Sequence, residues 1–428
     1  MAGAGPTIFI SVAAYREFDL PTTLADCFAM AADPDQLRVC VCWQHGPDES
    51  LGQFATDPRL DVIPVPYQDS QGVCWARHQI QRRYGGEAYF LQIDGHHRFA
   101  PGWDLTLIDM LEQLRRDGVQ KPVLTGYVPA FDPGNDPAGR VREVWGTGFD
   151  RFEPAGVVFM KPFVIPAATR PVPARFWSAH FSFSDGHFND DVVVNPEAYF
   201  HSEEIVMGVR AWTHGYDLFT PQVTVLWHEY TRRGRICHWD DHNDWTRRHT
   251  RAVADYRRLF GVDGTPRETP ATYGFGTVRS LHDYERFAGI EFASRGVRPH
   301  TVAHGVPPDA GHDEPLDHWR SGLLTSHVAD IAVDRSLVAG EGCRWRVFAH
   351  AEDGTEVFRD DYPDDRAATI LAGQSGSTLH LTLAFCGPHI PKTWTLWSHG
   401  PTMDPRRHCI SGSWPSPGTA SDTTSTPH

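Results

Sequence analysis

The sequence predicts an α/β protein whose larger N-terminal part is a mainly parallel sheet flanked by helices, followed by a smaller β-rich part. Over residues 1–260, short apolar runs alternate with amphipathic helical segments, which is typical of a parallel sheet. With 428 residues, the chain is too long for one small core. We expect a main domain over 1–260, an extension over 261–327, a β-sandwich-like domain over 328–410 and a disordered tail over 411–428.

The first elements follow from local pattern. The β-branched run TIFISVA at 7–13 predicts a strand, and Pro21 fits the first turn of the helix that follows. Apolar runs predict further strands at 38–43, 60–65, 89–93, 122–128, 156–160 and 217–227. Apolar residues at helical spacing predict helices at 71–84, 103–117, 202–213 and 247–260.

One segment fits neither pattern. Residues 176–191 (FWSAHFSFSDGHFNDD) mix aromatic and polar side chains, and we expect a loop that lines a cleft. The paired acids Asp190 and Asp191 suit acceptor binding or simple solvation, and the residues alone do not assign them a role. The residues alone assign no role to Glu204 either.

Composition narrows the function classes. The formal net charge of −15 argues against a general nucleic-acid binder, which needs a basic face for phosphates. The sequence has no run of about 18 apolar residues, so we expect no membrane span. Residues 1–6 lack the pattern of a signal peptide. The eight cysteines form no CxxC pair. We therefore expect a cytoplasmic protein.

Asp94-Gly95-His96 directly follows the predicted strand at 89–93. A carboxylate and an imidazole two residues apart at the C-terminal end of such a strand can reach one divalent cation, and ligands bind at this edge of α/β sheets. The alternative is an ordinary polar turn, since Asp and Gly favour turns.

Three further stretches carry polar groups that suit chemistry. They are GVCWAR at 72–77, FHSEE at 200–204 with VRAW at 209–212, and WHEY at 227–230. Each also has a structural explanation: acids favour the first turn of a helix, an Arg on a helix is often solvated, and a His after a strand is often a core residue.

Taken together, these stretches resemble GT-A-fold, nucleotide-sugar-dependent glycosyltransferases. Within that class, FISVAAYREFDLPTTLADCF, VCVCWQ and YFLQIDGHHRF resemble the cytoplasmic hydroxyproline-directed polypeptide α-N-acetylglucosaminyltransferases, over roughly residues 7–260. The resemblance to mucin-type polypeptide N-acetylgalactosaminyltransferases is more distant. The chain departs from that family at His201-Ser202, where the family has Gly-Gly, and its C-terminal part does not resemble that family's lectin domain.

The resemblance implies a GT-A, Rossmann-like fold and a set of site residues. It assigns metal binding to Asp94, His96 and His228 and a catalytic position to Glu203, whose segment ends in the matching pair Arg210 and Trp212. Gly72 and Arg77 match the donor-side helix, and Arg16 follows the first strand, where it can reach the nucleotide.

What the resemblance implies about the reaction is transfer of a sugar, expected to be N-acetylglucosamine, from a UDP-sugar to a hydroxyl acceptor with retention. Two imidazoles with one carboxylate favour Mn²⁺ over Mg²⁺. Glu203 would orient the acceptor hydroxyl or stabilise the oxocarbenium-like centre. The acceptor stays open: a peptide hydroxyl, a small natural product or another sugar.

Two other hypotheses compete with sugar transfer. The 14 tryptophans and the β-rich C-terminal part suit a non-catalytic carbohydrate-binding or glycoprotein-binding protein. A non-haem iron oxygenase needs a His-x-Asp pair with a distant His, whereas Asp94-x-His96 has the reverse order.

Overall fold

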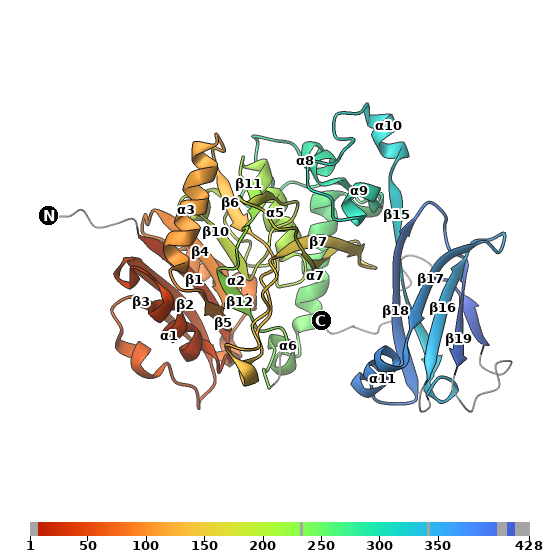
Figure 1. Cartoon of the computed structure of the whole chain (residues 1–428), viewed down its shortest axis with the longest axis horizontal. Coiled ribbons are helices and arrows are strands. Elements are labelled where there is room, and N and C mark those ends of the chain that lie inside the picture. The colour runs from red at the N-terminus through yellow and green to blue at the C-terminus, as the bar shows by residue number, and fades with distance from the viewer. Residues whose placement is uncertain (1–6, 232–233, 340–342, 400–408, 416–428) are drawn as a thin grey trace.

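A computed structural model describes residues 7–231, 234–339, 343–399 and 409–415. The larger part of the molecule is built around an eight-stranded sheet (Figure 1). Its strand order is β3 (Leu60–Pro66), β2 (Leu37–His45), β1 (Ile8–Tyr15), β4 (Tyr89–Asp94), β10 (Phe181–Asp185), β6 (Pro122–Thr125), β11 (Asp217–Thr220) and β9 (Val172–Pro173). Strands β3, β2, β1 and β4 are mutually parallel, as are β6 and β11, while β10 and β9 pair antiparallel.

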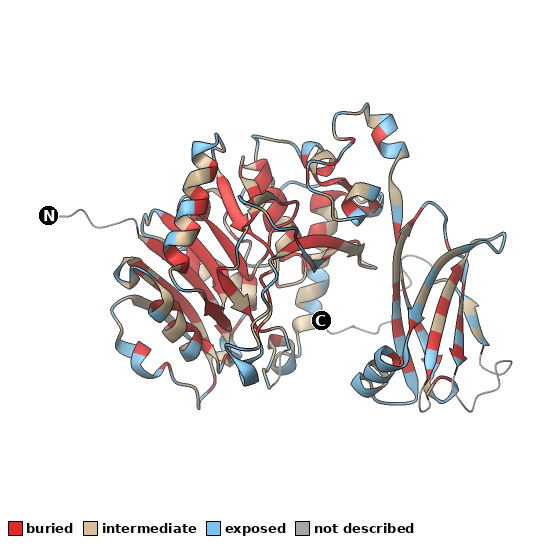
Figure 2. Cartoon of the chain, viewed as in Figure 1, coloured by how far each residue is buried: buried red, intermediate tan, exposed pale blue. Residues whose placement is uncertain are grey.

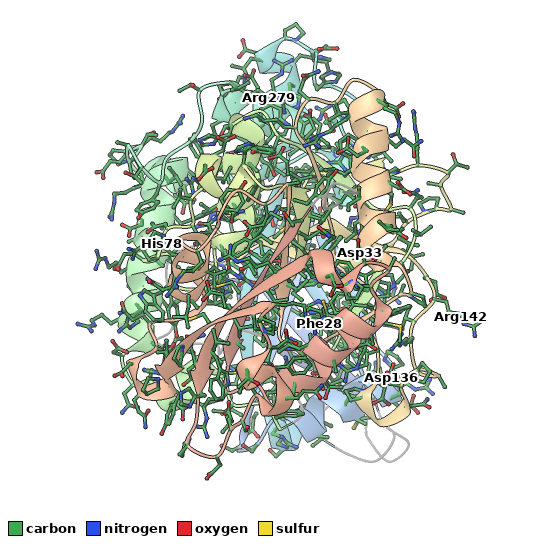
Figure 3. The ribbon with its side chains drawn as sticks, turned by 90° about the vertical axis from the view of Figure 1, so that its left-hand side faces the viewer. Phe28, Asp33, His78, Asp136, Arg142 and Arg279 are labelled. Carbon is green, nitrogen blue, oxygen red and sulfur yellow. The ribbon has the colours of Figure 1, made fainter. Side chains whose placement is uncertain are left out.

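Helices cover both faces of this sheet because the side chains of its strands alternate between the faces. On one face Ile10 and Val12 of β1 pack with α1 (Leu20–Met30) and α3 (Trp103–Arg116). On the other, Phe9 packs in a core with α2 (Val73–Gln81), α4 (Phe188–Asp191) and α5 (Glu203–Thr213). Figure 2 shows the buried strands between these layers, and in Figure 3 His78 of α2 lies on the opposite side from the loop residue Asp136. The expected α/β fold, a mainly parallel sheet flanked by helices, is confirmed.

The prediction that 176–191 is only a loop is wrong. Its central residues form β10, which pairs antiparallel with β4 and β6 in the middle of the sheet. Phe181 and Phe183 enter one core, and Ser182 and Ser184 are buried on the opposite face. Ser182 accepts a hydrogen bond from Trp177 Nε1, so its hydroxyl is satisfied inside the protein. The alternation of aromatic and polar residues was therefore that of a strand buried on both faces.

Further elements outside the eight-stranded sheet belong to the same body, and they continue past residue 260. It contains β7 (Trp145–Phe152), β8 (Val158–Val164), α6 (His238–Asp241), α7 (Trp245–Phe260), α8 (Leu281–Ala288), α9 (Pro299–Val302) and α10 (Leu316–Ser321). One apolar core joins Phe149, Val209, Tyr256, Leu281 and Phe292. Packing is thus continuous across the expected boundary at 260, and the domain limits stay a prediction.

Two four-stranded antiparallel sheets form the C-terminal part. One has the order β13 (Ile290–Glu291), β14 (Gly296–Val297), β15 (Leu324–Asp334), β18 (Thr378–Gly387) and the other β17 (Glu356–Tyr362), β16 (Arg344–His350), β19 (Thr393–His399), β20 (Cys409–Ser413). Ile331 and Leu381 of the first sheet share a core with Val347 and Leu396 of the second, next to α11 (Asp364–Gly373). The two sheets form the expected β-sandwich-like unit.

Two sequence expectations concern the chain ends and the membrane. Of the tail expected from 411 on, residues 411–413 belong to β20, and 416–428 lie outside the described residues. Among the described residues, no helix combines the length and the apolar character needed to cross a membrane. No disulfide joins any of the eight cysteines, all of which lie in the described part of the chain.

Candidate metal centre

A short strand pair brings two distant parts of the chain together at the carboxyl end of β4. Asp94 is the last residue of β4, and β5 (His97–Phe99) begins three residues later. Strand β5 pairs antiparallel with β12 (Leu226–His228), so that His228 lies opposite His97. This register sets the His228 side chain beside Asp94 and His96.

The three predicted metal ligands converge. Nε2 of His228 lies 3.5 Å from Oδ2 of Asp94, and Nε2 of His96 lies 3.9 Å from the same oxygen. The two imidazole rings are 4.5 Å apart between centroids. Each of the three residues offers one ligand atom, and these atoms all lie within 4.8 Å of one another. A spacing of this size suits one shared cation with bonds of about 2.0–2.6 Å.

The chemistry of these side chains also fits a cation. His228 is buried, and among the described residues neither of its ring nitrogens makes a hydrogen bond. A buried polar group without a partner costs about 1–3 kcal/mol, which a metal bond to one nitrogen would offset. One carboxylate oxygen and two imidazole nitrogens form a donor set that suits a divalent first-row metal.

Protonation states at neutral pH favour the same conclusion. Burial lowers the pKa of the His228 imidazole to about 4, and the His96 ring adds to this effect, so the ring is neutral. Burial acts to raise the pKa of Asp94, but the His228 imidazole and the Arg77 guanidinium outweigh it and hold that pKa well below its usual range. The centre therefore offers an ionised carboxylate and a neutral imidazole.

Asp94 is held by two consecutive ion pairs, from Glu203 to Arg77 and from Arg77 to Asp94. Arg77 on α2 donates from Nη2 to Oδ1 of Asp94 at 2.9 Å and from Nη1 to both carboxylate oxygens of Glu203. The side chains of Arg77 and Glu203 are only 3% and 4% exposed. Arg77 is thus not a solvated helix residue, and Glu203 is occupied by Arg77 rather than open to solvent. Ser202 precedes α5 at the N-cap without a capping hydrogen bond from its side chain.

The other predicted donor residues lie on neighbouring elements. Gly72 is the N-cap of α2 with φ of 104°, and a Cβ there would meet the Tyr199 ring at 2.9 Å, so both backbone and space require glycine. Arg16 donates from Nη1 to both oxygens of Asp241 on α6, at 3.0 and 3.1 Å, and stacks over Tyr67. Arg16 thereby joins the end of β1 to α6 and not to the three predicted ligands.

Arg210 and Trp212, which supported the assignment of Glu203, have structural contacts. Arg210 is buried and donates to the carbonyl oxygens of Gly274 and Val193. Trp212 packs in the core against Tyr284. This pair anchors α5, and α5 in turn presents Glu203.

Sequence reasoning missed two residues at the centre. Glu17, just after β1, accepts a hydrogen bond from Nδ1 of His96 at 2.7 Å. His180 is buried with its ring 4.6 Å from that of His228, and its Nδ1 lies 3.1 Å from the Ser178 hydroxyl. Glu17 was recognisable from its place after β1, because β1 and β4 are parallel neighbours whose ends meet. His180 stood in the segment taken for a loop.

The sequence assigned no role to Glu204, Asp190 and Asp191, and the structure places them in different surroundings. Glu204 accepts from the Ala179 amide at 2.8 Å and from the Tyr127 hydroxyl at 3.0 Å, and burial raises its pKa to about 7. Asp191 binds Lys121 Nζ at 2.7 Å, and the Asp190 side chain is 67% exposed. Neither Asp190 nor Asp191 belongs to the group of three ligands.

Comparison with known proteins identifies the family. The model of the family described as Glycosyltransferase (GlcNAc) matches residues 7–57 and 52–294. Similar solved structures include GalNAc-T7 with UDP, GalNAc and Mn²⁺ (13% identity, 60% of this chain and 50% of that chain, TM-score 0.44). Another is S. aureus TarS 1-349, with 11% identity over 60% of this chain and 74% of that chain and a TM-score of 0.36. The structure of S. aureus TarS 1-349 in complex with UDP-GlcNAc has 13% identity over 52% of this chain and 58% of that chain, with a TM-score of 0.34.

This chain spans half the length of the GalNAc-T7 chain, and no curated protein matches it. The family model covers well over half of the chain, including every residue of the centre described above. The chain therefore belongs to the GlcNAc glycosyltransferase family.

Proposed function

We propose that this protein is a metal-dependent glycosyltransferase that moves N-acetylglucosamine from UDP-N-acetylglucosamine to an acceptor hydroxyl with retention. The observation that carries the proposal is the convergence of Asp94, His96 and His228, whose ligand atoms lie within 4.8 Å of one another at the carboxyl end of β4. The family description, which names GlcNAc, supports the choice of donor sugar.

A divalent cation, Mn²⁺ or Mg²⁺, held by these three residues would neutralise the negative charge that develops on the β-phosphate of the leaving UDP. The chain's own groups prepare this site. Arg77 keeps Asp94 ionised and fixes its orientation through the 2.9 Å hydrogen bond to Oδ1. Glu203 keeps Arg77 charged and in place inside the protein.

The residues proposed for the donor are Arg16, Gly72, Arg77 and Asp94. Gly72 allows the backbone at the start of α2 to pass close to its neighbours, and helix N-termini attract phosphate groups. Arg16 would contact the nucleotide at the end of β1. A catalytic role for Glu203 at the acceptor hydroxyl requires its carboxylate to exchange part of its contact with Arg77 for the substrate.

For the acceptor we propose a hydroxyl on a peptide, with hydroxyproline as the first candidate because of the resemblance over residues 7–260. A small-molecule hydroxyl is the alternative. We also propose a cytoplasmic location, which the lack of disulfides among the eight described cysteines supports and cell fractionation would test.

The test is release of UDP from UDP-N-acetylglucosamine, with UDP-N-acetylgalactosamine as the matched donor, in the presence of Mn²⁺ and after its removal by EDTA. We expect slow, Mn²⁺-dependent hydrolysis without an acceptor and faster turnover with a hydroxyproline peptide but not with the same peptide containing proline. An NMR spectrum of the product would show the α-anomer. Absence of both binding and turnover with every UDP-sugar tried would refute the donor assignment.

A further inference from the structure

Glu17 is a buried carboxylate with one strong partner at the centre. Its side chain is 6% exposed, and its Oε2 lies 2.7 Å from Nδ1 of His96. An ionised carboxylate can only accept a hydrogen bond, so a His96 ring that binds a metal through one nitrogen carries its proton on Nδ1. The lone pair of His96 is then on Nε2, the nitrogen 3.9 Å from Oδ2 of Asp94.

We propose that Glu17 is a positioning residue of the metal centre, which holds His96 in the tautomer and orientation that present Nε2 to the cation. This inference rests on the proposed metal site. Carboxylates that accept from the second nitrogen of a metal-binding imidazole orient the ring and make it a better ligand. Glu17 itself touches neither cation nor substrate.

Gly95 gives independent support from packing. A Cβ at this position would lie 2.8 Å from Cγ of Glu17, closer than real Cβ contacts. The φ of Gly95 is not in the left-handed region, so backbone freedom does not explain this glycine. The middle residue of Asp94-Gly95-His96 is therefore glycine because the Glu17 side chain occupies the space beside it.

Arg235 extends the role of Glu17 to the third ligand. Its Nη1 lies 3.6 Å from Oε2 of Glu17, and its Nη2 lies 3.0 Å from Oε2 of Glu229, the residue after His228. One carboxylate thus contacts His96 directly and the segment after His228 through an arginine. Glu17 links the two chain segments that supply the ligands.

The test measures Mn²⁺ affinity of the full-length protein by isothermal titration calorimetry, without sugar donor. Glu17→Ala is expected to weaken Mn²⁺ binding about 10–100-fold, the usual effect of removing such a partner. Glu17→Gln keeps an acceptor oxygen and most of the shape, and should recover part of the affinity. Gly95→Ala should weaken binding in the same direction because it displaces Glu17.

Glu49→Gln is the matched control, because the half-buried Glu49 carboxylate is within electrostatic range of Glu17 but does not hydrogen-bond to His96. It should change Mn²⁺ affinity less than about twofold, well below the tenfold effect expected of a true partner. Melting temperatures without metal show whether each variant is folded, and Glu17→Gln decides the question if Glu17→Ala is not.

The outcomes separate the two proposals. If both Glu17 variants bind Mn²⁺ as the wild type does, or lose no more affinity than Glu49→Gln, Glu17 is not a positioning residue. A wild-type protein that binds no divalent cation overturns both proposals. A wild type that binds Mn²⁺ through Glu17-dependent geometry but releases no UDP overturns only the proposed transfer.

Discussion

The metal centre and the C-terminal sandwich use charged residues in opposite ways. At the carboxyl ends of β4 and β12, charges and imidazoles are inside the protein, as with Arg77, Glu203 and His228. In the sandwich, the core between the sheets is apolar, and ion pairs such as Arg346–Asp361 lie on the surface with 42% and 54% of their side chains exposed.

The two arrangements differ in what the charged groups cost or contribute in free energy. A buried ion costs several kcal/mol of desolvation, which close pairing only partly offsets, whereas an exposed pair contributes about 0–1 kcal/mol. Buried charge that does not improve stability is expected where a protein binds or transforms a ligand. The comparison thus points to the α/β body as the place of the proposed sugar transfer.

The largest expected effect is that of His228→Ala. Loss of one of three ligands should abolish metal-dependent turnover, by about a hundredfold or more, since metal stabilisation is worth several kcal/mol. The fold should survive because no hydrogen bond of His228 is lost. Steady-state UDP release and Mn²⁺ titration measure the effect.

His180→Asn is the control for that prediction. Its ring lies 4.6 Å from that of His228, yet it is not one of the three ligands. We expect Mn²⁺ affinity to fall far less than in His228→Ala. Equal losses in the two variants would mean that the ligand set is wrong.

The second effect concerns the buried ion pair. Arg77→Met leaves the Glu203 carboxylate buried without its partner and should lower the free energy of unfolding by about 3–5 kcal/mol. The double variant Arg77→Met, Glu203→Leu should regain most of that stability but no activity. Urea denaturation measures both, and a single variant as stable as the wild type would show that the pair is not the buried unit described.

Sequence alone was sufficient for much of this body and for naming the three residues whose ligand atoms converge. Apolar runs and helical spacing depend on neighbouring residues, so β1, β4 and α5 were predictable, and Asp94 and His96 lie on one turn. His228 was identified by resemblance. Arg77 could not be recognised as buried, because its burial depends on Glu203, 126 residues away. β10 escaped because its serines are polar yet lie inside the sheet.

The third effect is a pH dependence of stability that comes from two carboxyl groups with raised pKa values. Burial raises the pKa of Glu204 and of Glu285 from 4.5 to about 7. Between these pH values the folded state binds more protons than the unfolded state, so this stabilising term is present below pH 4.5 and is lost as pH rises through 7. At about 1.4 kcal/mol per pKa unit, the loss is about 3–4 kcal/mol for each residue.

Glu204→Gln and Glu285→Gln should each remove that loss, seen as a flatter dependence of the free energy of unfolding on pH between 4.5 and 8. Glu204 accepts from the amide of Ala179, the residue before His180, whereas Glu285 on α8 accepts from the Phe292 amide. Only Glu204→Gln should also change UDP release. If Glu285→Gln changes it equally, a raised pKa does not mark the site.

The smallest effect belongs to the sandwich. Arg346→Ala removes an exposed partner of Asp361 and should change the free energy of unfolding by less than about 1 kcal/mol. UDP release should be unchanged. A large loss of activity in this variant would show that the sandwich takes part in catalysis and would break the contrast with the body.

We propose that one cation binds where β4 and β12 end. Diffraction from crystals grown with Mn²⁺, recorded at the manganese absorption edge, tests it directly. We expect one anomalous peak within bonding distance of the side chains of Asp94, His96 and His228. A peak elsewhere, or a peak whose ligands do not include His228, would contradict it.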